Sequence, residues 1–243
     1  MESIIGFIPA RGGSKRIPNK NLKKLAGKPL LAYTIEAAVQ SELFTDIIVS
    51  SDNRGILDLA SEMGVNVDLR PEHLAGDMVQ SFEVVEEYLN RSDMAGKYQH
   101  VVKLLPTCPM RLPKDLVLAY KMYTEFDGDC FLVSIAEYDF PPQLALEAVK
   151  GGPTIKICEP KSYAVNVTSQ TFRPRYRPNG AIYMAPVDAF LNAKTFFANP
   201  LIGYKMPPER SVDIDLPHQM QIAELLMEKN LRNREKFAGS SAQ

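Results

Sequence analysis

A glycine-rich, cationic loop between an apolar strand and an amphipathic helix is the feature that most constrains this chain. The apolar run 4–8 predicts a buried strand, and residues 30–39 have the apolar spacing of an amphipathic helix. Between them, Gly12 and Gly13 allow a tight turn and a close approach of backbone N–H groups to a ligand. No acidic residue interrupts residues 3–35, and the cations there are Arg11, Lys15, Arg16, Lys20, Lys23, Lys24 and Lys28. The pattern predicts a cradle for a polyphosphate.

The loop differs from the two best-known phosphate-binding motifs. It has neither the G-x-x-x-x-G-K-[ST] spacing nor the G-x-G-x-x-G spacing. A solvated basic surface loop is the alternative interpretation. The position directly after the first strand favours a ligand site, because ligands of open α/β sheets bind outside the carboxyl ends of the strands.

Composition narrows the class of protein. With 243 residues and 45% hydrophobic content, the chain can bury the core of one large domain. A net charge of −1 argues against general nucleic-acid binding, which needs a wider basic surface. No apolar run approaches the ~20 residues that span a bilayer, and the N-terminus lacks signal-peptide features. Three scattered cysteines suggest neither a disulfide framework nor a zinc site. We expect a cytoplasmic protein without a membrane partner.

Strands and helices alternate along most of the chain. The predicted strands are 4–8, 46–52, 65–69, 100–105, 130–135, 179–184 and 202–206, and the predicted helices are 30–39, 56–63, 81–89, 115–126, 187–191 and 217–229. This alternation predicts an α/β fold with a doubly wound, mostly parallel sheet.

One segment breaks the alternation. Residues 137–178 are proline-rich and irregular, and a structureless loop of that length is unusual inside a compact domain. We interpret them as an inserted excursion with short strands that packs on another subunit. The prediction is therefore a single domain over 1–232 with this insertion, followed by a tail at 233–243. The end of the tail, 238–243, is polar, and we expect it to be disordered.

The pair Asp213 and Asp215 is a candidate metal site. Alternate residues of an extended segment point to one side, so both carboxylates can converge on one hard cation. Mg²⁺ takes one or two carboxylates together with phosphate oxygens, which suits a nucleotide site. The alternative is that Asp215 caps the helix that starts near Pro217.

Alternating arginines form a third candidate. In an extended segment Arg173, Arg175 and Arg177 would face one way and could hold an anionic substrate. They could equally form an exposed edge that discourages sheet pairing. Cys108 lacks an obvious histidine partner, so we expect a buried or loop thiol and not a nucleophile.

Taken in order, these motifs resemble the CMP-N-acylneuraminate cytidylyltransferases, the CMP-sialic acid synthetase family. The resemblance spans the chain and rests on the segments 8–21, 48–52, 69–77, 105–111, 177–183 and 211–215. The family has a nucleotide-binding α/β fold and works as a homodimer, and its dimerisation segment resembles 137–178.

The resemblance implies a Mg²⁺-dependent transfer of CMP from CTP to a 2-keto sugar acid, with release of pyrophosphate, for surface polysaccharide synthesis. It implies catalytic roles for Arg11, Lys15 and Asp213. The implied nucleotide-binding residues are Arg11, Gly13, Ser14, Lys15, Lys20, Asn21, Arg70 and Ser81. Asp213 and Asp215 would bind the metal. The implied residues of the acceptor side are Arg173, Arg175, Asn179 and Tyr183.

Two positions depart from the family pattern. Leu105 stands where many members have Gln, and Ser169 stands where they tend to have Arg. Both positions lie on the acyl-sugar side, so the acceptor could be another nonulosonic acid. The remaining alternatives are a nucleotidyltransferase for a sugar phosphate or phosphonate, a glycosyltransferase that uses the two aspartates, and a non-catalytic nucleotide-binding regulator.

Overall fold

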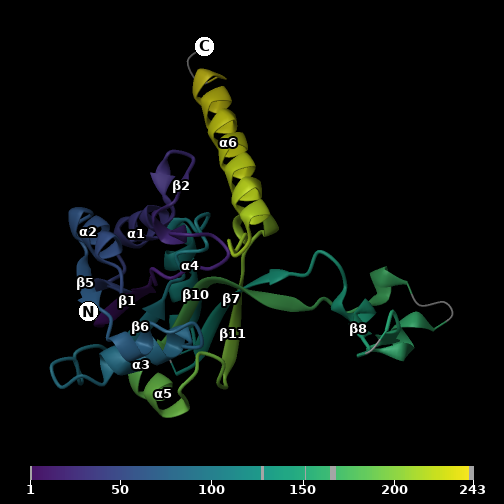
Figure 1. The fold of residues 1–243 in the computed structure, drawn as a ribbon, viewed down its shortest axis with the longest axis horizontal. Helices are drawn as coiled ribbons and strands as arrows, with labels where there is room; N and C mark the ends of the chain where they lie inside the picture. Colours follow the sequence, from purple (N-terminus) through teal and green to yellow (C-terminus); the bar gives the residue numbers. More distant parts are fainter. Residues whose placement is uncertain (1, 127–128, 151, 165–167, 241–243) are drawn as a thin grey trace.

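The computed structural model describes residues 2–126, 129–150, 152–164 and 168–240, without the side chains of Ser169 and of residues 230–240. The chain forms a globular body from which two parts project (Figure 1). One is the arm, which we define as residues 138–175, and the other is the C-terminal helix α6 (Pro217–Ser240). Among the described helices, none is both long and apolar enough to cross a membrane.

A seven-stranded sheet forms the centre of the body, in the order β11-β7-β10-β6-β1-β4-β5. Its strands are β1 (Ile4–Pro9), β4 (Asp46–Ser51), β5 (Asn66–Leu69), β6 (His100–Lys103), β7 (Phe131–Glu137), β10 (Tyr176–Pro186) and β11 (Leu201–Lys205). Only β10 runs antiparallel to its neighbours, and the other pairs are parallel. The predicted α/β fold with a mostly parallel sheet is confirmed.

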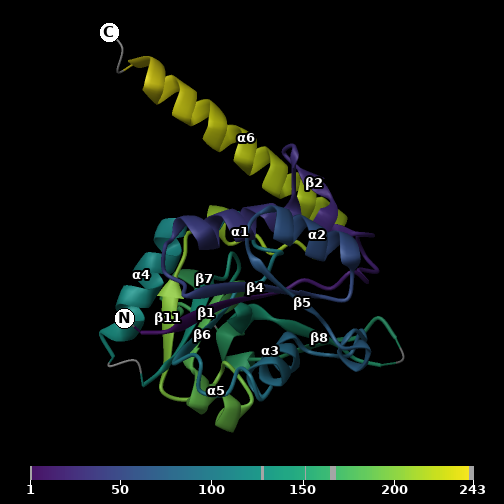
Figure 2. The same ribbon diagram turned by 90° about the vertical axis from the view of Figure 1, so that its left-hand side faces the viewer.

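Helices cover both faces of this sheet (Figure 2). One face carries α1 (Leu30–Gln40), α2 (Arg54–Glu62) and α4 (Pro113–Thr124), and the other carries α3 (Ser81–Leu89) and α5 (Val187–Ala193). Strand residues alternate between the two cores, because successive side chains of a strand point to opposite faces. In β1, Ile4 and Ile8 pack under α1, whereas Ile5 and Phe7 pack under α3.

Several short elements were not predicted. A small hairpin joins β2 (Lys24–Leu25) to β3 (Lys28–Pro29). The 3₁₀ turns lie at Lys20–Leu22, Glu72–Leu74, Pro142–Leu144, Pro160–Tyr163, Ser169–Thr171 and Pro208–Arg210. Such two- to four-residue elements are too short to show a hydrophobic period in the sequence.

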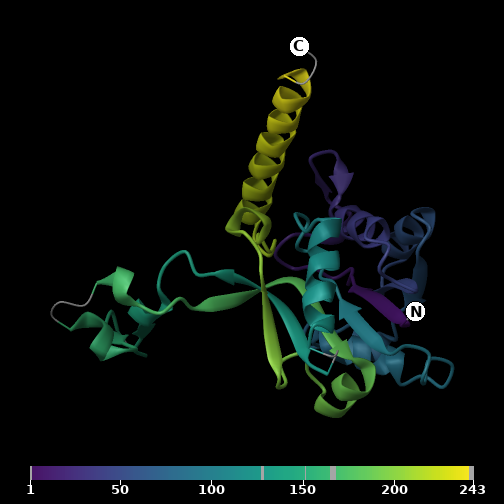
Figure 3. The same cartoon turned by 180° about the vertical axis from the view of Figure 1, so that it is seen from behind.

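The arm leaves the body along two sheet strands (Figures 1 and 3). β7 and β10 continue outward, so that Glu137 pairs with Tyr176 at the base of the arm. Farther out, β8 (Leu146–Ala148) pairs with β9 (Ile155–Ile157). In the described part of 137–178, the chain thus leaves the body and forms the short strands β8 and β9, as expected.

Helix α6 is longer than predicted. It continues past Lys229 to Ser240, so most of the expected tail at 233–243 is helical, and residues 241–243 lie outside the described part. The reason is local composition. After Pro217 the segment holds no further proline, no glycine before Gly239, and many strong helix formers.

A fully buried carboxylate, Asp115, joins three parts of the body. It accepts a hydrogen bond from the backbone N–H of Leu112 at the start of α4 (2.9 Å). It also accepts from the Tyr204 hydroxyl of β11 (3.1 Å) and forms an ion pair with Arg210 (2.7 Å). Arg210 directly precedes the segment that carries Asp213, so this contact fixes where that segment starts.

We expect Asp115→Ala to lower the free energy of unfolding by about 3–5 kcal/mol, because it leaves the guanidinium of Arg210 without its buried partner. Lys205→Ala is the matched control, since the Lys205–Glu137 pair is about half exposed and worth no more than about 1 kcal/mol. Urea unfolding of both variants measures the difference. Equal losses in the two variants would contradict the structural role of Asp115.

Candidate active site

The predicted nucleotide loop lies at the carboxyl edge of the sheet. β1 sits between β6 and β4, and the chain passes from one side of β1 to the other between β5 and β6. Such a reversal of strand order opens a crevice at the carboxyl ends of the strands, where α/β proteins bind ligands. The loop that follows β1 crosses this edge.

Gly12 seats the loop against the end of β4. Its backbone N–H donates to Oδ1 of Asp52 (2.8 Å). A Cβ at position 12 would lie 2.6 Å from Cβ of Asn53, the residue that caps α2 through a bond from the Ile56 N–H. At Gly13, in contrast, a Cβ would meet no atom within 4 Å. The loop is therefore tightly packed at Gly12 and open toward a ligand at Gly13.

The two cations predicted to bind the triphosphate converge on one carboxylate. Arg11 and Lys15 contact opposite oxygens of Asp77, at 3.0 and 2.5 Å. The hydrogen bond from Lys15 lowers the pKa of Asp77. Ser14, also predicted, turns back within the loop through a bond from its N–H to the Gly12 carbonyl (3.0 Å). Asp77 was not predicted to act here, because its partners lie more than 60 residues away in the sequence.

Asn21 and Arg70, the residues predicted around the cytidine, are buried at this edge. The Asn21 amide donates to the Arg11 carbonyl (2.9 Å), and Arg70 donates to the Ser50 carbonyl (2.9 Å). Each keeps one buried polar atom without a protein partner among the described residues, Oδ1 of Asn21 and Nε of Arg70. Buried polar groups are normally satisfied, so these two atoms are suited to a bound ligand or water.

A surface pocket opens beside Arg70. It is lined by Asp52, Leu69, Arg70, Pro71, Glu72 and Ala75. Burial lowers the pKa of Arg70, which the charges of Asp52 and Asp68 partly offset. The pocket therefore has a buried guanidinium at its wall.

Ser81, also predicted near the cytidine, opens α3 at the same edge. Its hydroxyl oxygen accepts a hydrogen bond from Nζ of Lys103 (3.0 Å). Lys103 is 6% exposed and ends β6. Sequence reasoning missed it, although a lysine inside the apolar run 100–105 was the available signal.

The carboxylate of Asp213 fits a metal site. Burial raises its pKa, and its Oδ1 has no protein partner among the described residues. Gly180 makes room for it, since a Cβ there would lie 3.1 Å from Oδ2 of Asp213 and 2.9 Å from Sγ of Cys108. The backbone of Gly180 has a φ of +79°, which a side chain would also disfavour.

Asp215 lies near Asp213 and pairs with the loop. Its charge contributes to the raised pKa of Asp213, while its own carboxylate accepts from Nζ of Lys20 (2.8 Å) and lies 3.7 Å from Arg16. The Asp215 carboxylate thus bonds to the loop, while the Gln219 side chain accepts from the backbone N–H groups of residues 215 and 216.

In the part of the chain that the structure describes, no group of three or more His, Cys, Asp or Glu side chains could hold a metal ion. Two carboxylates suffice for Mg²⁺ only when phosphate oxygens and water complete the octahedron. The residues therefore fit a metal that arrives with a nucleotide.

The acceptor residues predicted on β10 are both buried. Asn179 is fully buried, and its amide bonds to Ser134 (2.6 Å) and Ser211 (2.9 Å). Tyr183 is 8% exposed, and its ring contacts Phe196 and Phe197, with centroids 5.9 and 6.0 Å away. The Asn179 side chain thus holds neighbouring protein segments together, and its polar atoms bond to protein groups. Tyr183 belongs to an aromatic cluster with Phe196 and Phe197.

Arg173 and Arg175 lie on the arm, which projects from the globular body (Figure 3). Arg175 forms an ion pair with Glu159 (2.6 Å), another arm residue. Arg177, at the base of the arm, donates to the Ser211 carbonyl (3.4 Å). Among the described residues, no hydrogen bond or ion pair joins the side chain of Arg173 or Arg175 to another predicted site residue.

The Cys108 side chain is a buried thiol, as expected. It is 1% exposed and donates to the Asn179 carbonyl (3.1 Å). Burial and the nearby charge of Asp213 raise its pKa. Because the thiolate is the reactive form, this cysteine is not poised as a nucleophile.

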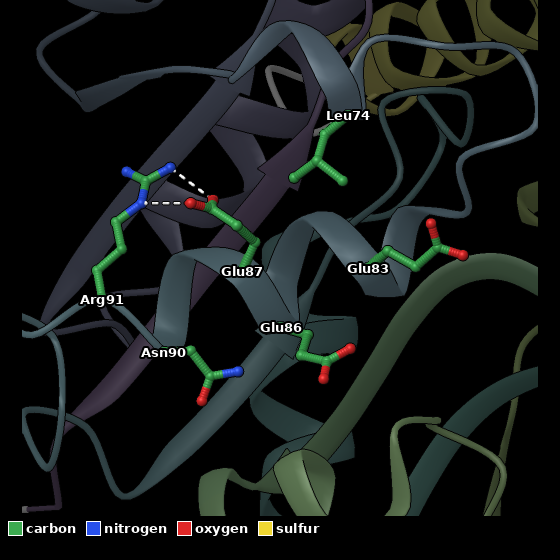
Figure 4. Close-up of a pocket in the computed structure, with 6 residues that line it drawn as sticks. All are labelled: Leu74, Glu83, Glu86, Glu87, Asn90 and Arg91. Atoms are coloured by element: carbon green, nitrogen blue, oxygen red, sulfur yellow. Dashed lines mark hydrogen bonds and ion pairs between the residues drawn. The ribbon is translucent and has the colours of Figure 1, made fainter.

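A second pocket lies on the outer side of α3 (Figure 4). It is lined by Leu74, Glu83, Glu86, Glu87, Asn90 and Arg91. Three of its four charged residues pair within the fold, since Arg91 bonds to Glu87 (2.7 Å) and Glu86 pairs with Lys194 (2.8 Å). The carboxyl edge, with its unpaired polar atoms, is the better candidate for the site.

Comparison with known proteins identifies the family of this chain. Residues 5–134 match the profile of a family described as cytidylyltransferase. The chain is 36% identical to the N-acylneuraminate cytidylyltransferase of Escherichia coli over 234 residues, which cover 96% of this chain and 54% of that enzyme. The chain therefore spans about half the length of that relative.

Two further proteins match over nearly their whole length. The CMP-N,N'-diacetyllegionaminic acid synthase of Legionella pneumophila is 34% identical over 230 residues, with 93% of this chain and 97% of that enzyme covered. A solved structure of a CMP:2-keto-3-deoxy-manno-octonic acid synthetase complexed with CTP superposes with a TM-score of 0.69. It is 16% identical and covers 94% of this chain and 100% of that chain, so it shows the shared fold.

We expect Gly12→Ala to lower the free energy of unfolding by about 1–3 kcal/mol, because the added methyl would overlap Cβ of Asn53. Gly13→Ala is the matched control, since open space surrounds that position. Thermal unfolding of both variants without ligand measures the effect. Equal melting temperatures for the two variants would mean that the loop does not rest on the end of β4.

Proposed function

The chain belongs to the cytidylyltransferase family, and on that premise we propose that it transfers CMP from CTP to a 2-keto sugar acid in the cytoplasm. The acceptor class is a nonulosonic acid such as sialic or legionaminic acid. The observation that carries the proposal is the meeting, at one sheet edge, of the cationic loop after β1 and the unpartnered carboxylate oxygen of Asp213. These are the parts that a metal-bound triphosphate needs.

The transfer would be a displacement at the α-phosphate of CTP. The anomeric hydroxyl oxygen of the acceptor forms the new P–O bond and loses its proton to solvent, and pyrophosphate leaves with the electrons of the broken P–O bond. Arg11 and Lys15 would neutralise charge on the phosphates, in place of their present partner Asp77. Catalysis of this kind depends largely on positioning and on stabilising the developing charge.

Asp213 and Asp215 would hold the divalent cation, which cytidylyltransferases generally use. When bound, Mg²⁺ would supply additional neutralisation of the phosphate charge. Lys20 orients Asp215 from the loop side, because its ammonium also donates to the Ile214 carbonyl (2.7 Å) and so holds the 213–215 segment against the loop.

Gly13 would present its backbone N–H and Ser14 its hydroxyl to the phosphates, and Asn21, Arg70 and Ser81 would surround the nucleoside. The open space beyond Gly13 and the unpaired atoms of Asn21 and Arg70 support this assignment.

We also propose that the enzyme is a homodimer joined through the arm. The arm exposes apolar side chains, among them Phe140 (67% exposed) and Ile155 (61%). An apolar surface of this kind on a projecting segment is typical of a protein interface. Arg173 and Arg175 lie on the same arm, so they would bind an acceptor in the site of the partner subunit and not in their own.

If the arm joins two copies, Ile155→Glu should turn a dimer into a monomer, because it would bury a charge in the interface. We expect the dimer dissociation constant to rise at least about 100-fold, measured by sedimentation equilibrium. Val117→Glu, at a half-exposed apolar position of α4 on the body, should leave the dimer intact. A wild-type monomer at micromolar concentration would contradict the proposal.

The enzymatic proposal is tested by pyrophosphate release with CTP, Mg²⁺ and a panel of acceptors. The panel contains sialic acid, its diacetamido relatives, a Kdo-type acid, hexose 1-phosphates and a simple phosphonate, with the other three nucleotides as controls. We expect release only with CTP and a keto sugar acid. Release only with a phosphate or phosphonate would keep the nucleotide site and overturn the acceptor class. Binding of CTP without release would favour a regulator.

Two variants assign that activity to this site. Lys15→Ala should lower kcat/KM by about 100- to 1,000-fold through loss of transition-state charge stabilisation. Lys15 is 81% exposed, so the fold should not change. Asp213→Asn should raise the Mg²⁺ concentration needed for half-maximal rate. An unchanged Mg²⁺ titration would exclude Asp213 as a ligand.

A further inference from the structure

Lys103 is a buried cation at the point where the nucleotide and acceptor sides of the site meet. It ends β6, pairs in register with Phe7 of β1 on one side and with Tyr183 of β10 on the other, and is 6% exposed. Its ammonium lies 4.1 Å from the ring centre of Tyr183 and 4.8 Å from that of Phe196. The aromatic faces attract the cation but provide no counter-charge.

Lys103 differs from the other cations of this edge in its partners. Arg11 and Lys15 share Asp77, and Lys20 pairs with Asp215. For Lys103, no carboxylate of the described residues lies within 4 Å, and the hydroxyl oxygen of Ser81 is the one acceptor bonded to it there. An ammonium has three N–H donors, so its bonding capacity is largely unused.

Burial without a counter-charge is costly for a cation. Burial alone lowers the pKa of Lys103 to about 8. The buried Arg111 is a useful contrast, because it donates to the Ala181 carbonyl and to the Thr34 hydroxyl inside the core. The guanidinium of Arg111 thus has two acceptors in the core, whereas the ammonium of Lys103 has one and retains N–H donors that could bind an anion.

We propose that the ammonium of Lys103 binds the acidic group of the acceptor, and so helps to determine that the acceptor is an acid. This inference rests on the proposed function and adds a specificity residue to it. The site for the acid is formed by Lys103, the Ser81 hydroxyl and the aromatic cluster of Tyr183, Phe196 and Phe197.

The position of Tyr183 indicates that the anion bound by Lys103 belongs to the acceptor and not to CTP. Asp213 lies near enough for its charge to add to the effect of burial in raising the pKa of Tyr183. Tyr183 is thus near both Lys103 and the proposed metal ligand, which suits an acceptor that attacks a metal-bound α-phosphate. The triphosphate already has the cations of the loop at residues 11–20.

A dependence on pH follows from this assignment. The groups that face Lys103 are Ser81 of α3, Tyr183 of β10, Phe7 of β1 and Phe196, of which only Tyr183 titrates, and burial raises its pKa. The acid binds the charged form of Lys103, which is lost as the pH rises through about 8 in the enzyme without acceptor. The acceptor KM should therefore rise above that pH.

The test compares wild type, Lys103→Met and Lys103→Arg by pyrophosphate release, with the acids of the panel as acceptors. We expect Lys103→Met to raise the acceptor KM about 10- to 100-fold, the range of a charge-assisted hydrogen bond, with the KM for CTP within about twofold. Lys103→Arg should restore part of the affinity and remove the rise above pH 8, because a guanidinium stays charged. Lys97→Met is the matched control, since Lys97 also stacks on a tyrosine (Tyr98, 5.0 Å), before the start of β6.

The outcomes separate this inference from the proposed function. An equal acceptor KM in wild type and Lys103→Met, or a rise confined to the KM for CTP, would overturn the role of Lys103 alone. If Lys103→Met does not fold, persistence of the rise above pH 8 in Lys103→Arg would overturn it. Absence of release by the wild type with every acid would overturn the proposed function and this inference with it.

Discussion

The buried amide of Asn179 is the contact on which the geometry of the site depends. Its Oδ1 accepts from the Ser134 hydroxyl of β7 and from the Ala181 N–H (3.2 Å), and its Nδ2 donates to Ser211. A buried side chain whose oxygen and nitrogen both have partners specifies one arrangement, because any other would leave buried polar atoms unpaired. This amide therefore joins the antiparallel strand β10, its neighbour β7 and the segment that leads to Asp213. The next residue, Gly180, completes the placement, since only a residue without a Cβ leaves space for the Asp213 carboxylate.

Charge balance explains how the site can exist without its ligands. The loop after β1 concentrates cations, and like charges at close range would repel one another and open the loop. Asp77 and Asp215 prevent this, one contacting Arg11 and Lys15 and the other contacting Lys20. Most of these pairs are exposed, so each contributes little to stability and is screened by salt. Because the pairs of Arg11 and Lys15 with Asp77 are weak and exposed, a triphosphate could replace Asp77 as their partner at a small cost in free energy.

The sequence predicted the parts of this protein whose signals are local, and it failed where distant residues meet. Continuous apolar runs predicted most strands of the sheet, because both of its faces are covered by helices, and the glycines located the loop. The partnership of Arg11 with Asp77 joins residues 66 positions apart and follows only from the strand order. Alternation also suggested that Arg173 and Arg175 face a substrate, but in the structure Arg175 pairs with Glu159 of the arm, 16 residues earlier in the chain.

Lys103 shows why the acceptor side is the harder half to predict. A triphosphate demands several cations within a few residues of a turn, so its site leaves a dense signal in one stretch of sequence. An acid with a single charge needs one cation, and in this fold that cation comes from a strand, the hydroxyl from a helix start and the rings from β10 and the segment after α5. A lysine within a buried strand weakens the fold, because its desolvation is offset only by ring faces and one hydroxyl. An apolar residue at that position would make β6 more stable. The packing of the sheet therefore does not explain the lysine, whereas the binding of an anion does.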